Sequence, residues 1–128
     1  MIADTTFLSD LLRERQREKQ GPASAMLRRL RDGRVRTTII SVAEIAVLFD
    51  QSFEAWTWLE HWKIYPLHQG IAQKAADIDR QLKNSGQRLG ENDNWIAGFA
   101  AYYQEPVISH DAVFDRIPGV RRMAYERA

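Results

Sequence analysis

Short apolar runs alternate along the chain with longer segments in which apolar residues recur every three or four positions. The first pattern is typical of buried strands and the second of helices with one buried face. We predict strands at Met1–Ala3, Val35–Ile40, Ile64–Leu67, Pro106–Ser109 and Val120–Tyr125. We predict helices at Thr5–Leu12, Ala23–Arg31, Ser41–Gln51, Phe53–Trp62, Ile71–Lys83 and Asn92–Tyr103. Because strands alternate with helices, the sequence predicts an α/β fold with a mostly parallel sheet of four or five strands between two helical layers.

Composition narrows the class of protein. The length of 128 residues predicts a single domain spanning residues 1–128. There is no cysteine, which excludes disulfides, thiolate metal sites and cysteine nucleophiles and fits a reducing cytoplasm. The N-terminal segment lacks the pattern of a signal peptide, and no apolar run reaches the roughly 20 residues that span a bilayer. We therefore predict a cytoplasmic protein with no membrane segment.

Four acidic residues are expected at one edge of this sheet. Asp4 follows the first strand, Glu44 lies about one helical turn beyond the second, and Asp111 lies two residues past Pro106–Ser109. Asp93 begins the helix that leads into that last strand. Strand ends and the starts of the following helices share one edge of a parallel sheet, and binding sites form outside the carboxyl ends of the strands. The four carboxylates are therefore predicted to converge.

Each acid also has a purely structural interpretation. Asp4 and Asp93 suit the first turn of a helix, and Asp111 suits an Asx turn. The segment from Ser41 to Glu44 fits a capping box, in which the glutamate reaches back to the serine amide. Taken one at a time, these structural roles are the favoured interpretation, because such positions prefer acids.

The four acids taken together favour a metal site. Carboxylates crowded into one crevice repel each other unless a cation lies among them. Oxygen ligands of this kind suit Mg²⁺ or Mn²⁺. Such an ion lowers the pKa of a bound water and neutralises a phosphoryl oxygen during in-line attack. The pattern therefore predicts metal-dependent hydrolysis of a phosphodiester.

Four segments, in this order, resemble one known family: MIADTT, TTIISVAEI, NDNWIAGFA and VISHDAVFDRIPGV. They are similar to the strand-and-acid motifs of the PIN-domain ribonucleases, and most of all to those of the small VapC-type toxins. The resemblance covers nearly the whole chain. It implies a PIN-like three-layer α/β/α fold.

The resemblance also implies a site. Asp4, Glu44, Asp93 and Asp111 would be ligands of Mg²⁺ or Mn²⁺, directly or through water, and Thr6 and Ser109 would be polar groups near the metal or a phosphate. RNA would be cut to leave a 3′-hydroxyl and a 5′-phosphate. A cognate antitoxin would neutralise the enzyme, which would be a homodimer and would meet DNA only through that antitoxin.

Two residues depart from the family pattern. Val113 replaces the second aspartate of the last motif, which removes one possible outer metal ligand and argues against a tightly held second metal. Gly98 replaces a common alanine in the helix that carries Asp93, which weakens the helix and would permit a close approach there.

The net charge is only +1, so any affinity for nucleic acid must come from local patches. One basic cluster comprises Arg13, Arg15, Arg17 and Lys19, and a second comprises Arg28, Arg29, Arg31, Arg34 and Arg36. Acids are interleaved in the first cluster, so we interpret it as a solvated helical face. For the second cluster, phosphate binding and simple solvation remain equally open.

Three tryptophans, Trp56, Trp58 and Trp62, lie within seven positions. They cannot all point inward from one helix, and exposed aromatic side chains mark interfaces. We therefore predict that this segment contacts the antitoxin. Two other functions remain open: a PIN-type housekeeping nuclease without an antitoxin, and a non-enzymatic module in which the acids only cap helices and the aromatic segment docks a partner.

Overall fold

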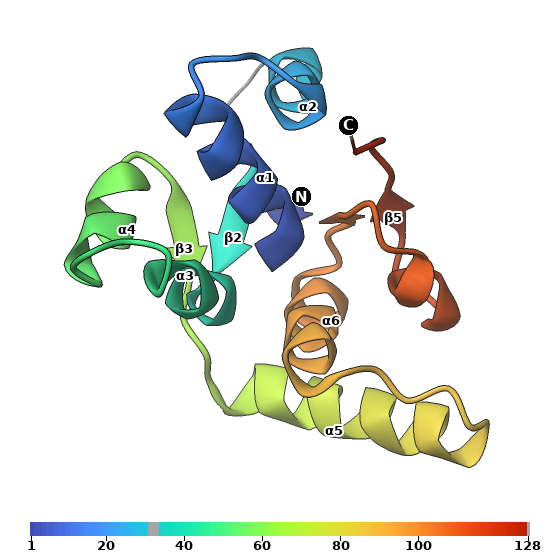
Figure 1. Ribbon diagram of the computed structural model, residues 1–128. Helices are drawn as coiled ribbons and strands as arrows, with labels where there is room; N and C mark the ends of the chain where they lie inside the picture. The colour runs from blue at the N-terminus through green and yellow to red at the C-terminus, as the bar shows by residue number, and fades with distance from the viewer. Residues whose placement is uncertain (31–33, 128) are drawn as a thin grey trace.

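The computed structural model describes residues 1–30 and 34–127, and a parallel sheet of five strands forms its centre (Figure 1). The strands are β1 (Ile2–Ala3), β2 (Arg36–Thr38), β3 (Lys63–Tyr65), β4 (Val107–Ile108) and β5 (Arg122–Met123). Their order is β3-β2-β1-β4-β5, and every neighbouring pair is parallel. The predicted α/β class is confirmed, with a sheet that is wholly rather than mostly parallel.

Helices cover both faces of the sheet. They are α1 (Thr5–Gln16), α2 (Pro22–Leu30), α3 (Ile39–Ala46), α4 (Phe53–Trp58), α5 (Gln69–Asn84), α6 (Glu91–Tyr103) and the 3₁₀ helix η1 (Ala112–Arg116). None of these helices combines the length and the apolar character that a membrane crossing needs. The predicted second helix ran to Arg31 with Asp32 and Gly33 as its stop, and these three residues lie outside the described residues.

Two hydrophobic cores lie on opposite faces of the sheet. One is formed by apolar side chains of α1, α2, α3 and α4, and the other by those of α5, α6 and η1. In β1, Ala3 belongs to the first core and Ile2 to the second, because successive strand residues face opposite ways. This arrangement is the predicted α/β/α sandwich.

Several predicted boundaries are wrong; for example, α3 ends at Ala46 and not at Gln51. The second strand ends at Thr38 instead of Ile40, and Ile39 already belongs to α3. The side chain of Thr38 caps α3 by accepting a hydrogen bond from the Ser41 amide at 3.1 Å. Ser41 is therefore inside the helix, and the predicted capping box between Ser41 and Glu44 does not exist. The predicted helix Phe53–Trp62 is also shorter, since α4 ends at Trp58.

Gly98 allows α5 and α6 to pack closely, as predicted. A Cβ atom added at this position would lie 2.9 Å from the Cβ of Ala75 and 3.0 Å from the carbonyl oxygen of Ile71. Contacts this short require the two helices to separate, which is unfavourable in a close-packed core. The glycine therefore fixes the position of α6, the helix that carries Asp93, against α5.

Candidate active site

The four acidic residues lie at the carboxyl edge of the sheet. Strands β2, β1 and β4 are neighbours, so the segments that leave them meet at this edge. Asp4 follows β1 directly, Glu44 is in α3 behind β2, and Asp111 is in the loop after β4. Asp93 is in the first turn of α6. The structure thus brings together segments that are far apart in sequence.

Asp4 is the most buried of these acids, with 3% of its surface exposed. It is the N-cap of α1, and its Oδ1 accepts a hydrogen bond from the Phe7 amide at 2.8 Å. The pKa of Asp4 is raised to about 6, chiefly by burial and also by the negative charges of Asp93 and Asp111, against the opposing effect of hydrogen bonds from Ser109 and Phe7. A helix cap that served only structure would not need two further carboxylates beside it.

Asp93 is half-buried in the first turn of α6. The N-cap of this helix is Gly90, so Asp93 does not have the capping role. Burial raises the pKa of Asp93, and the charges of Asp111 and Glu44 add to the increase. Together with the influence of Asp93 and Asp111 on Asp4, this makes the four carboxylates one electrostatically coupled group.

Glu44 is held by a threonine that the sequence interpretation missed. The hydroxyl of Thr5 donates to Glu44 Oε1 at 2.6 Å and lies 3.1 Å from the hydroxyl of Ser41. Thr6, the predicted polar neighbour of the metal, makes no side-chain hydrogen bond to any residue that the structure describes. The contact between Thr5 and Glu44 arises because β1 and β2 are neighbours, which places the first residue of α1 beside α3. This adjacency is the signal that the sequence interpretation missed.

Asp111 and Ser109 are linked through the loop that follows β4. Ser109 is fully buried, and its hydroxyl accepts a hydrogen bond from the Asp111 amide at 3.0 Å. Asp111 Oδ1 in turn accepts from the Val113 amide at 3.0 Å, so Asp111 also caps η1. Val113 packs against the core between α5 and α6. An apolar residue at position 113 is therefore consistent with its surroundings.

The chemistry of these side chains suits a hydrated divalent cation. Carboxylate oxygens are hard ligands, and the pKa values of Asp4 and Asp93 are raised by burial and by neighbouring negative charges, which a cation would neutralise. Across residues 1–30 and 34–127, no three His, Asp or Glu side chains are arranged to hold an ion directly. Mg²⁺ commonly keeps several of its waters and takes only one or two carboxylates as direct ligands. The group therefore fits coordination that is partly mediated by water.

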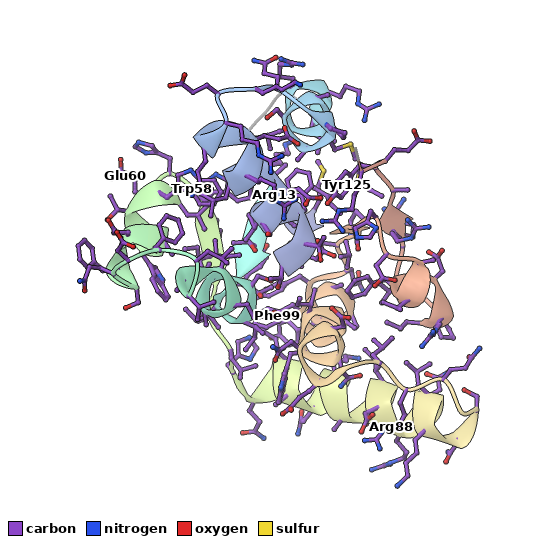
Figure 2. All side chains as sticks on the ribbon, in the orientation of Figure 1. Arg13, Trp58, Glu60, Arg88, Phe99 and Tyr125 are labelled. Carbon is purple, nitrogen blue, oxygen red and sulfur yellow. The ribbon has the colours of Figure 1, made fainter. Side chains whose placement is uncertain are left out.

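An ionic clasp centred on the buried Asp10 lies beside these acids, and no local sequence pattern predicts it. Asp10 of α1 accepts hydrogen bonds from the Tyr125 hydroxyl at 2.7 Å and from Arg127 Nε and Nη2 at 3.0 and 2.9 Å. Arg13 also donates to Asp10, at 3.1 Å. Figure 2 labels Arg13 and Tyr125, two of these donors. The clasp ties the segment after β5 across α1. It also brings Arg127 to 3.4 Å from His110, the residue before Asp111.

Replacing Asp10 with asparagine should lower the free energy of unfolding by about 2 kcal/mol, because hydrogen bonds to a charged, nearly buried carboxylate are lost. Chemical denaturation measures the change. Asp115→Asn is the matched control, since Asp115 makes the same kind of two-pronged contact with Arg122 but is 54% exposed. An equal loss in the two variants would show that the clasp has no special structural importance.

The three predicted interface tryptophans have different surroundings. Trp56 is 38% exposed on α4, whereas Trp58 and Trp62 are partly buried against the core beneath α4. Three apolar residues nearby in sequence are even more exposed: Val47, Leu48 and Phe53, at 82%, 54% and 65%. We call Val47, Leu48, Phe53 and Trp56 the apolar patch. The exposed apolar surface thus begins at the end of α3, earlier than the tryptophan pattern indicated.

Comparison with known proteins agrees with this architecture. A model of the PIN domain family matches residues 1–120. No curated protein sequence matches the chain.

Several solved structures share its fold. The chain superimposes on a chain of VapBC2 from Rickettsia felis bound to a promoter DNA fragment, with a TM-score of 0.80, 15% identity and 98% coverage of both chains. FitAcB from Neisseria gonorrhoeae gives a TM-score of 0.76 at 21% identity, with 95% coverage of both chains. VapBC-5 from Mycobacterium tuberculosis, a toxin–antitoxin system, gives 0.68 at 25% identity, with 96% coverage of both chains. With the family model covering most of its length and its fold matching VapC-type structures, the chain belongs to the PIN-domain family.

Proposed function

We propose that this protein is a metal-dependent endoribonuclease that hydrolyses RNA phosphodiesters and serves as the toxin of a toxin–antitoxin pair. One observation carries the proposal: the coupling of Asp4, Glu44, Asp93 and Asp111 at the carboxyl edge of a PIN-domain sheet, with raised pKa values at Asp4 and Asp93. Four acids used only as helix caps would have no need to converge.

In this proposal Asp4, Asp93, Asp111 and Glu44 hold Mg²⁺ or Mn²⁺, directly or through water. The ion, when bound, supplies a water of lowered pKa and neutralises charge on the phosphoryl oxygens. The chain supplies the fixed geometry. Phe7 and Ser109 orient the Asp4 carboxylate, and Thr5 orients Glu44 by its hydrogen bond. The hydroxyl of Ser109 and the side chain of Thr6 are the proposed polar groups near a metal-bound water or phosphate.

The partner is proposed on the same basis. The structures with a similar fold include toxin–antitoxin systems, and some are bound to DNA. We infer a cognate antitoxin that neutralises this chain and that carries any contact with DNA. A homodimer and a cytoplasmic location are parts of the same proposal.

We propose that the antitoxin covers the apolar patch and the neighbouring Trp58 and Trp62. Binding should then shift the tryptophan emission to shorter wavelength, because Trp56 loses its contact with water. Trp56→Phe should remove most of this shift, whereas Trp95→Phe, a change in α6 far from the patch in sequence, should retain it. Unchanged emission of the parent protein in a confirmed complex would contradict this contact.

The proposed activity is tested with a matched pair of single-stranded oligonucleotides, one RNA and one DNA, of the same base sequence. The purified protein with Mg²⁺ should cut the RNA and leave a 3′-hydroxyl and a 5′-phosphate, identified by end-labelling. A cyclic phosphate at the 3′ end would indicate attack by the ribose 2′-hydroxyl and would contradict metal-assisted hydrolysis by water. Cleavage that persists in the presence of the purified antitoxin would favour the housekeeping nuclease.

A further inference from the structure

The charge run at the end of α1 is divided between two sides of the helix. Arg13 and Arg17, one turn apart, line a cavity of about 520 Å³ together with Lys19 and Arg127. Arg15 and Glu18 instead line a separate cavity with Trp62, and Lys19 borders both cavities. The run is therefore not one uniformly solvated face, as the interleaved acids had indicated. We call the cavity lined by Arg13, Arg17, Lys19 and Arg127 the basic groove.

The acids of the basic groove are already occupied. Asp10 accepts hydrogen bonds from Arg13, Arg127 and Tyr125. Glu14 accepts from the amides of three residues at the start of α2, namely Gly21, Ala23 and Ser24, at 2.8 to 2.9 Å. These hydrogen bonds lower the pKa of Glu14, and they hold its negative charge at the start of α2.

The positively charged side chains of the groove are less engaged in ion pairs. Arg13 and Arg127 are 46% and 41% exposed although they contact Asp10. Arg17 and Lys19 are exposed, and neither side chain forms an ion pair with a residue that the structure describes. Four cations thus face two engaged carboxylates, so the groove is positively charged overall. An anionic ligand can bind there without displacing an internal ion pair.

The groove leads to the candidate active site. Arg127 lies 3.4 Å from His110, whose neighbour in sequence is Asp111, and the charge of Asp4 acts on Arg127. Asp4 begins α1, so Arg13 lies about 14 Å and Arg17 about 20 Å farther along the helix, at a rise of 1.5 Å per residue. These distances are comparable to the length of a few nucleotides. The cations therefore extend in one direction away from the acids.

We propose that the basic groove binds the phosphates of a single-stranded RNA on one side of the bond that is cut. This inference rests on the proposed ribonuclease function and specifies where the substrate lies. Flexible basic side chains in a groove follow a phosphate backbone without reading its bases. The groove thus supplies affinity, while the acids supply the chemistry.

The second basic cluster does not offer an equivalent surface. Arg36 donates to Glu105 at 3.0 Å, next to the amino terminus of the chain and so at the opposite edge of the sheet from the acids. Arg28 is hydrogen-bonded to Gln20, and Arg29 lies against the sulfur of Met26. Arg28 and Arg29 line one cavity together with Glu126, whereas Arg36 lies apart from them, so these members of the cluster are divided between two parts of the molecule. Arg31 lies outside the described residues.

A charge-matched pair of double variants tests the proposal. Arg17→Ala with Lys19→Ala removes two groove cations, and Lys74→Ala with Arg80→Ala removes two exposed cations of α5, on the far side of the molecule (Figure 1). Each pair changes the net charge equally. Neither pair removes a contact with a described residue, so both variants should retain the parent's thermal midpoint.

RNA affinity is measured by fluorescence anisotropy with a labelled oligouridine of twelve nucleotides, in an Asp93→Asn background with Mg²⁺ to prevent cleavage. The groove variant should bind at least about tenfold more weakly. It should also lower the slope of log affinity against log salt by about 1.4, at roughly 0.7 for each lost phosphate contact. The α5 variant should match the parent protein. Equal weakening in the two variants, or none in either, would overturn the proposal.

Cleavage assays on the same substitutions in the active protein separate this proposal from the proposed function. If the protein cuts RNA but the groove variant binds and cuts as well as the α5 variant, the proposed role of the basic groove is wrong. The proposed nuclease function is then unaffected. If RNA binding depends on the groove but no RNA is cut, the proposed role of the basic groove is supported and the proposed nuclease function is wrong. If the groove variant loses only its affinity for the antitoxin, the groove is a protein-docking surface and the RNA proposal is overturned.

Discussion

Replacing Asp93 with asparagine is expected to lower the rate of RNA cleavage by about 10³-fold, while the protein keeps its fold. The amide has the shape of the carboxylate but no charge, so the site loses one of the acids that hold the cation. A single group that stabilises charge in a transition state commonly contributes a factor of this size. The rate is measured with saturating RNA and Mg²⁺.

The matched control is Glu91→Gln, the same chemical change in the same turn of α6. Glu91 is exposed, and its charge is not among the causes of the raised pKa values of Asp4 and Asp93. This variant should cut RNA within about twofold of the parent rate. Equal losses in the two variants would mean that the start of α6 needs negative charge in general and would contradict a specific role for Asp93.

Replacing Asp4 with asparagine should stabilise the metal-free protein at neutral pH by about 2 to 3 kcal/mol. The pKa of Asp4 is about 6 in the folded protein and 3.8 in an ordinary exposed aspartate, and each pKa unit corresponds to about 1.4 kcal/mol. The folded protein thus holds this proton more tightly than the unfolded chain. The stability that Asp4 contributes is present below pH 3.8 and is lost as the pH rises through about 6. Asparagine keeps the cap to Phe7 and carries no charge to bury.

Denaturation at several pH values in EDTA measures this effect. The difference between Asp4→Asn and the parent should be small below pH 4 and should grow up to about pH 6. Saturating Mg²⁺ should then stabilise the parent at pH 7.5 but not the variant, by about 2.7 kcal/mol at a hundredfold excess over the dissociation constant. A difference that is the same at every pH would contradict the burial of an uncompensated charge at Asp4.

The parallel sheet and the convergence of the four acids could both be predicted from the sequence, and for the same reason. Apolar runs mark buried strands, and a parallel arrangement places every residue that follows a strand at one edge. Asp4 and Asp111 are each within three residues of a strand end, so small errors in the boundaries did not move them. Glu44 was also correctly located, although its predicted partner in a capping box was wrong.

What the sequence could not indicate are contacts between residues far apart in the chain. Glu14 looked like one acid in a solvated charge run, yet it caps the start of α2. Asp10 looked like an ordinary helix acid, yet it holds Arg127 from the end of the chain. Whether a charged side chain is committed or free depends on packing in three dimensions, which no local pattern reports. The positive charge of the basic groove depends on the engagement of both acids, which only the three-dimensional structure shows.

The central claim is that the four carboxylates form one metal-dependent site for RNA cleavage. Its most direct test is the rate of cleavage of a defined single-stranded RNA as a function of free Mg²⁺, for the parent, Asp4→Asn, Asp93→Asn and Glu91→Gln. The parent and Glu91→Gln should show the same saturable dependence, abolished by EDTA and restored by excess Mg²⁺, while the two aspartate variants stay near background at every concentration. RNA cleavage that persists in EDTA, or aspartate variants that cut as fast as the parent, would contradict the claim.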